Sequence, residues 1–155
     1  MARYQATLNS PDSREALFDY LADFRSAAEW DPGVKAARLR GGKPGKAGAE
    51  FEITSRFAGR DVPLVYRAVE VDRPRRVLLV AESSSLVSRD EITVDEYDDG
   101  GTAVTYTADL RLRGPLCLFD PVLQVLFNRI GDNARDGLAE KLAQPLAERH
   151  GARAA

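Results

Sequence analysis

The sequence predicts an α+β domain in which a curved seven-stranded antiparallel sheet packs against a long C-terminal helix, with two short helices after the first strand. From residue 34 to residue 112, apolar and polar residues mostly alternate, and short glycine-rich turns separate the runs. After Gly114 the apolar residues return at helical spacing. A chain of 155 residues, 44% of them hydrophobic, can bury a core of its own without a disulfide or a structural metal.

The N-terminal elements precede the sheet's main run of strands. Residues 3–8 alternate as a first strand, and Asn9 or Ser10 before Pro11 predicts the start of a short helix. Residues 23–30 predict a second short helix, which Asp31-Pro32-Gly33 ends. Six further strands are expected at residues 34–40, 49–57, 62–71, 76–83, 86–96 and 102–112.

The last helix is predicted to begin at Asp120-Pro121 and to run to about residue 149. Its wide apolar stripe suits the concave face of a curved sheet. Gly131 and Gly137 within it indicate either close packing or room for a ligand. We expect residues 1–150 to form a single domain and residues 151–155 to be a disordered tail.

Opposite charges predict the register of two hairpins. A turn at Gly59-Arg60 would place Glu52 opposite Arg67. In the last hairpin, pairing Val94 with Val104 keeps apolar residues on one face. The same register sets Ile92 beside Tyr106, Asp90 beside Ala108 and Arg89 opposite Asp109.

The composition excludes several kinds of chemistry. Cys117 and His150 are the single cysteine and the single histidine, so we expect no disulfide, no metal site and no other cofactor. The net charge of −2, without a run of five like charges, argues against a nucleic-acid partner. The longest apolar stretch is far too short for an integral membrane segment, and no signal peptide is visible, so we expect a cytoplasmic location.

Several short sequence patterns occur in an order and spacing that are typical of one superfamily. They are Ser10-Pro11 with Leu17 and Phe18, Trp30-Asp31-Pro32-Gly33-Val34, Pro44-Gly45 to Gly48-Ala49, Tyr66-Arg67-Ala68-Val69, Pro74-Arg75-Arg76-Val77 and Gly101-Thr102-Ala103-Val104-Thr105-Tyr106. In these residues the chain resembles the START-like (SRPBCC) superfamily, in particular its bacterial polyketide cyclase/dehydrase and lipid-transport branch. The resemblance implies a helix-grip fold, with an internal apolar cavity between the sheet and the long helix.

The predicted register directs a set of mainly aromatic and aliphatic side chains inward. An aromatic-rich lining suits a flat or elongated apolar ligand, although the same side chains could simply fill a core. The candidate ligand-binding residues are Trp30, Phe51, Ile53, Ser55, Phe57, Leu64, Tyr66, Leu79, Ser88, Ile92 and Tyr106, together with Leu123, Phe127 and Ile130 on the long helix.

Asp90 is the one inward carboxylate in this register, and burying a carboxylate is costly unless it is paired or protonated. Three placements stay open: a hydrogen-bonded structural residue, an outward residue at a bulge, or an acid in the cavity. If the protein is an enzyme, Asp90 is the candidate general acid/base, and Tyr66 or Tyr106 would polarise a ligand carbonyl. Cyclases of this fold are expected to use an inward arginine, which the register does not supply.

These observations favour a protein that binds a small hydrophobic or aromatic ligand, such as a lipid, an isoprenoid or a polyketide. One alternative is a polyketide cyclase/dehydratase acting through Asp90 and the tyrosines. The other is a non-enzymatic stress or regulatory module that binds a protein through its apolar segment at residues 115–119 and the valines on the outer face of the middle strands. That segment could also form a lip over the cavity, and Cys117 within it is expected to be buried. A homodimer stays open.

Overall fold

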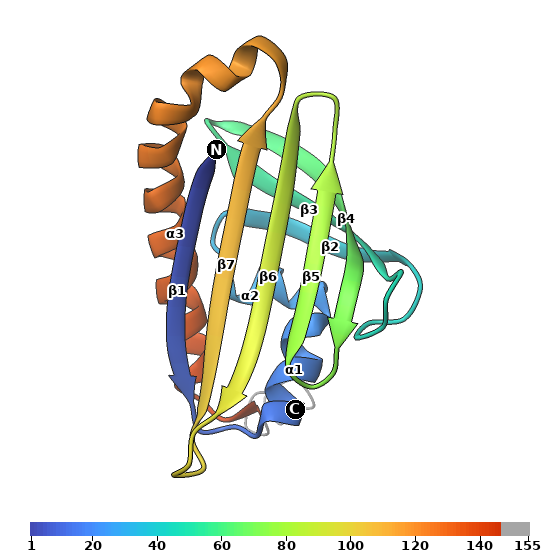
Figure 1. Cartoon of the computed structure of the whole chain (residues 1–155), viewed down its shortest axis with the longest axis vertical. Coiled ribbons are helices and arrows are strands. Elements are labelled where there is room, and N and C mark those ends of the chain that lie inside the picture. The colour runs from blue at the N-terminus through green and yellow to red at the C-terminus, as the bar shows by residue number, and fades with distance from the viewer. Residues whose placement is uncertain (147–155) are drawn as a thin grey trace.

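The computed structural model describes residues 1–146 and confirms the predicted architecture (Figure 1). One antiparallel sheet has the strand order β1-β7-β6-β5-β4-β3-β2. Its strands are β1 (Ala2–Ser10), β2 (Val34–Gly41), β3 (Glu50–Phe57), β4 (Arg60–Asp72), β5 (Arg76–Glu82), β6 (Leu86–Glu96) and β7 (Thr102–Leu112). The helices are α1 (Arg14–Ala22), η1 (Phe24–Ser26), α2 (Ala27–Trp30), η2 (Gly114–Phe119) and α3 (Asp120–Leu142).

The helices cover the sheet unevenly. Figure 1 shows α3 running alongside β1, with α1 near the lower end of the sheet and α2 about halfway along its height. The contacts agree with this arrangement, because α3 packs on β1, α1 packs on β6, and α2 touches the C-terminal part of α3. The two short helices and the second half of α3 therefore contribute to one buried cluster against the sheet.

The ends of two helices differ from the prediction. The N-cap of α1 is Ser13, whose Oγ accepts a hydrogen bond from the Ala16 amide at 3.3 Å, because β1 continues to Ser10. Helix α3 ends at Leu142, well before residue 149, and Pro145 follows shortly after it. His150 and the predicted tail at residues 151–155 lie outside the described residues.

One predicted register is confirmed and the other is wrong. Strands β6 and β7 pair Val94 with Val104 and Asp90 with Ala108, as expected. In the β3–β4 hairpin the turn is Ala58-Gly59, both with positive φ, so Glu52 lies opposite Val65. The error amounts to two residues, which leaves the same side chains on the inner face.

The charged partners of Glu52 also differ from the prediction, because they come from the neighbouring edge strand. Its carboxylate binds Arg38 at 2.7 Å and Arg40 at 3.7 Å on β2. Both arginines therefore lie on the outer face of the sheet.

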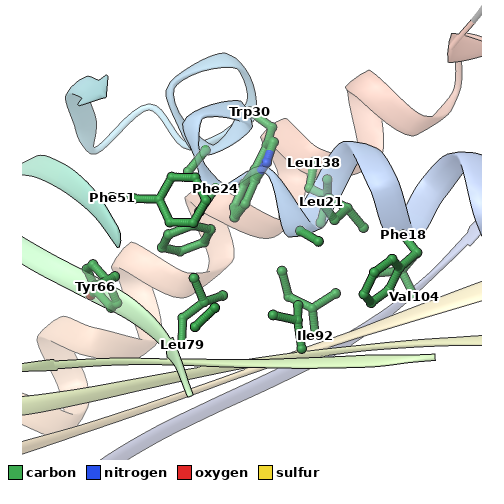
Figure 2. Packing of buried hydrophobic residues seen from close by; sticks show 14 of the residues in the cluster. Phe18, Leu21, Phe24, Trp30, Phe51, Tyr66, Leu79, Ile92, Val104 and Leu138 are labelled. Atoms are coloured by element: carbon green, nitrogen blue, oxygen red, sulfur yellow. The ribbon is translucent and has the colours of Figure 1, made fainter. Parts of the chain in front are cut away.

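The main core lies where α1, α2 and the second half of α3 meet the sheet (Figure 2). Phe24 packs edge-to-face against Tyr66, with ring centroids 5.2 Å apart, and Trp30 packs in the same way against Tyr106 at 5.7 Å. At Gly137 of α3, a Cβ would overlap the backbone carbonyl of Trp30. At Gly131 it would overlap the ring of Tyr4 on β1, so both glycines serve close packing.

Candidate ligand-binding cavity

A cavity of about 140 Å³ lies between the inner face of the sheet, α2 and α3. Residues of the main core line it, and so does Leu110 of a smaller apolar cluster formed by Ala2, Leu110 and Leu123. Most of its lining is apolar. The lining residues are Phe24, Ala27, Trp30, Asp31, Gly33, Val34, Ile53, Ser55, Arg56, Phe57, Val62, Leu64, Tyr66, Leu86, Ser88, Asp90, Tyr106, Ala108, Leu110, Leu112, Phe127 and Ile130.

The structure brings most of the predicted ligand-binding residues to this cavity. Those in its lining are Trp30, Ile53, Ser55, Phe57, Leu64, Tyr66, Ser88, Tyr106, Phe127 and Ile130. Phe51, Leu79 and Ile92 point inward but lie in the main core, and Leu123 lies in the smaller cluster. Figure 2 shows Leu79 and Ile92 packed among the core side chains. These four residues fill space and do not border the cavity.

A chain of hydrogen bonds crosses one wall of the cavity and ends at Asp90. The Tyr66 hydroxyl donates to Ser88 Oγ at 2.9 Å, and Ser88 Oγ donates to Asp90 Oδ1 at 3.4 Å. The Tyr106 hydroxyl donates to the other carboxylate oxygen, Oδ2, at 3.2 Å. We call these four residues the Asp90 cluster. Ser88 and Asp90 both point inward because they are two residues apart on β6.

Asp90 is 5% exposed, so the outward placement at a bulge is wrong. The other two placements both apply, since the carboxylate is hydrogen-bonded and also lines the cavity. Burial raises the pKa of Asp90 to about 7, against the opposing effect of the hydrogen bonds from Tyr106 and Ser88. Burial also raises the pKa values of Tyr66 and Tyr106 well above 10.0, so both phenols stay protonated near neutral pH.

A second carboxylate, Asp31, lines the cavity and was not among the predicted site residues. Its Oδ1 accepts a hydrogen bond from the Gly33 amide at 2.7 Å, as expected for a residue that ends a helix. Burial raises the pKa of its carboxyl group. The sequence marks Asp31 only as a helix stop, since loop residues have no periodicity to show which way they point.

Apolar residues near the ends of β6 and β7 were also missed. Leu110 and Leu112 line the cavity because they continue the inward alternation that begins at Tyr106 and Ala108. The same alternation, followed to the end of the strand, could have identified them.

Basic side chains contribute little to the lining of this cavity. Among the described residues that line the cavity, Arg56 is the single basic one, and its exposed guanidinium pairs with Asp61 at 3.3 Å. Arg67, on β4, is exposed. Within residues 1–146, no group of three or more histidine, cysteine, aspartate or glutamate side chains is arranged to hold a metal ion.

An exposed apolar surface lies where η2 leads into α3. It consists of Leu116, Leu118, Phe119, Val122, Val125 and Leu126. Cys117 is exposed as well, so its predicted burial is wrong. In the part of the chain that the structure describes, no helix is both long and apolar enough to cross a membrane.

The fold and the cavity together define a START-like protein. A structure of a START superfamily protein from Mycobacterium smegmatis is similar, with a TM-score of 0.75 at 11% identity over 93% of this chain and 99% of that one. Major latex-like protein 151 from Panax ginseng gives a TM-score of 0.63 at 12% identity, over 92% and 98% of the two chains. A protein from Thermobifida fusca gives 0.62 at 26% identity, over 92% and 93%.

The family follows from the sequence itself. Residues 1–143 match the family described as polyketide cyclase / dehydrase and lipid transport, and the chain belongs to that family. No curated protein matches the sequence significantly. Membership, together with the fold, indicates a hydrophobic ligand and leaves its identity open.

Proposed function

We propose that this protein binds a small hydrophobic or aromatic molecule in the cavity between the sheet and α3. The observation that carries the proposal is an apolar cavity of about 140 Å³ whose wall also holds the Asp90 cluster. A polar cluster beside apolar walls is typical of ligand sites, where a few polar groups orient a mostly apolar molecule. A packed core has no need of a buried carboxylate.

The volume of the cavity limits which of the expected ligands can fit. An apolar cavity of roughly 150 Å³ holds a molecule of the size of benzene, whereas sites for larger ligands measure about 300–1,000 Å³. The cavity therefore favours a compact ring compound. A long lipid chain or an extended polyketide would require α3 to move away from the sheet.

The proposal can be tested with a variant that fills the cavity. Ser55 lines the cavity, and the adjacent Thr54 is outside the lining and points the other way along β3. Ser55→Phe should weaken the binding of 2-phenylethanol by about tenfold or more, and Thr54→Phe should change it by less than about twofold. Quenching of Trp30, the single tryptophan, reports binding, because its ring lies in the cavity wall.

Native mass spectrometry of the purified protein, before and after organic extraction, gives an independent measurement. A retained small molecule that extraction removes supports the proposal. A protein that is always empty and binds no aromatic probe would contradict it.

A second function, acid–base catalysis on the bound ligand, is favoured by one specific observation. Asp90 has a pKa of about 7 and lies 3.2 Å from the Tyr106 hydroxyl, and such a carboxyl group can both donate and accept a proton near neutral pH. Tyr66 and Tyr106 would polarise a carbonyl only after turning their hydroxyl protons away from Ser88 and Asp90. Asp90→Asn should abolish turnover of a poly-β-ketone substrate while ligand binding persists, and full activity in this variant would exclude Asp90 as the acid/base.

A further inference from the structure

The hydrogen-bonding groups of the cavity wall are directed toward one another in a way that leaves mainly acceptors for a ligand. The Tyr66 proton goes to Ser88, and the protons of Ser88 and Tyr106 go to Asp90. Each hydroxyl in the cluster has therefore used its single donor. What stays available in the cluster is the set of lone pairs on the Asp90 carboxylate and on the tyrosine oxygens, and outside it the hydroxyl of Ser55 on β3, which can donate or accept.

The charged groups around the cavity are also mainly acidic. Asp90 on β6 and Asp31 after α2 place two carboxyl groups in the wall, and α3 contributes only Phe127 and Ile130. The remaining titratable groups are Tyr66 on β4, Tyr106 on β7 and Arg56 on β3. Arg56 is exposed and held by Asp61, so no cation among these described lining residues offsets the charge of Asp90.

We propose that the ligand carries a hydrogen-bond donor, most favourably a protonated primary amine, that binds the Asp90 carboxylate, and that carboxylic acids are excluded. This inference rests on the proposed ligand-binding function and narrows it to aromatic or aliphatic amines and, more weakly, alcohols. An ammonium group would supply the missing countercharge and form charge-assisted hydrogen bonds in a buried site. A ligand carboxylate would instead face two acidic groups and a row of acceptors.

Amine binding should be coupled to a proton. A bound ammonium group favours the ionised form of Asp90, so the carboxyl group loses its proton to solvent when the amine binds. Amine affinity should then rise as the pH increases from about 6 to 8, because less work is spent on deprotonating Asp90. The affinity of a neutral alcohol should change little over the same range.

Three probes of nearly equal size separate the possibilities: 2-phenylethylamine, 2-phenylethanol and phenylacetate. Titrations followed by Trp30 fluorescence and by calorimetry in two buffers of different ionisation enthalpy measure affinity and proton release. At pH 7.5 we expect the amine to bind at least about tenfold more tightly than phenylacetate, with the alcohol between them. The amine should release a fraction of a proton that increases as the pH is lowered toward 6, and the alcohol should release none.

Two variants test whether Asp90 causes the preference for the amine. Asp90→Asn should reduce the advantage of the amine over the alcohol to within about threefold and abolish proton release, since the charge that binds the amine is gone. Asp95→Asn is the matched control, because it removes the same charge from the exposed face of the same strand. It should leave both quantities unchanged.

The affinities of the three probes for the wild-type protein test the inference even if Asp90→Asn does not fold. Phenylacetate binding as tightly as the amine would overturn this inference and leave the proposed function standing. Equal amine preference in wild type and Asp90→Asn would also overturn it. Failure of all three probes to bind would overturn the inference together with the proposed function.

Discussion

The two halves of α3 face very different surroundings. The second half buries Ala134, Leu138 and Leu142 in the main core, and Leu138 is only 2% exposed. In the described part of the first half, Leu123 is the buried apolar side chain, Val122 and Val125 are 69% and 73% exposed, and Phe127 and Ile130 border the cavity. One half of the helix thus stabilises the fold, and the other half covers the space in which a ligand would lie.

This difference would let one helix serve both the stability of the fold and the proposed ligand binding. Tight packing at the α2 end supplies apolar burial, which scales with the area removed from water. The looser half keeps a cavity and therefore gives up some of that burial. Substitutions in the second half of α3 should therefore mainly lower stability, and substitutions in the first half should mainly alter ligand affinity.

The largest expected effect is a loss of stability with rising pH, which comes from Asp90 in the cavity wall. Asp90 has a pKa of about 7 in the folded protein and an ordinary value of 3.8, so the native state binds more protons than the unfolded state between these limits. The contribution to stability is therefore present at low pH and is lost as the pH rises to about 7. The difference between a pKa of 3.8 and one of about 7 corresponds to about 4 kcal/mol of unfolding free energy.

Denaturant unfolding of wild type and Asp90→Asn at several pH values measures this contribution. The stability of the variant relative to wild type should increase from pH 4 to pH 7 and then stay level. A constant difference across that range would show that Asp90 is not buried as described.

The second effect compares truncation of one apolar side chain in each half. Leu138→Ala should lower the free energy of unfolding by about 3 kcal/mol, because it leaves a hole in the main core. Phe127→Ala should cost only about 1 kcal/mol, since its ring is half-buried beside space that is already empty, but it should alter ligand affinity. Chemical denaturation and probe titration measure the two quantities, and equal losses of stability would refute the distinction.

The smallest effect compares the two glycines of α3. Gly137→Ala places a methyl group on the rigid Trp30 carbonyl, so it should destabilise the protein by about 2 kcal/mol despite the better helix propensity of alanine. At Gly131 the obstacle is the Tyr4 side chain, which can rotate away and give up its hydrogen bond to Asp132. Gly131→Ala should therefore change the melting temperature little, and a loss as large as that of Gly137→Ala would show that Tyr4 cannot move.

The sequence was most informative where two independent patterns agreed. In β6 and β7, alternation and opposite charges support one register, and both the strand ends and the pairing are confirmed. In the β3–β4 hairpin the turn uses Ala58 at positive φ, which few residues other than glycine adopt, so the sequence pointed to the wrong pair of turn residues. The inner face survived this error because the shift was two residues.

For the candidate site, alternation predicts which side chains point inward but not which of them border empty space. Ile53 and Ser55 line the cavity, whereas Phe51 on the same face lies in the core, because the helices cover only part of the sheet. Asp31 escaped prediction because its position depends on how the loop after α2 turns. The cytoplasmic location and the homodimer stay predictions.

The contact between Gly137 and Trp30 has a mechanical consequence. At this point the backbone of α3 rests directly on the backbone of α2, so no side chain can rearrange there to let the helix come closer. A swing of the preceding turns that widened the cavity would pivot at Gly137 and would break the two hydrogen bonds between the Gln124 side chain and the backbone of Arg3. In such a swing the exposed apolar residues of η2, at the far end of the helix, would move furthest.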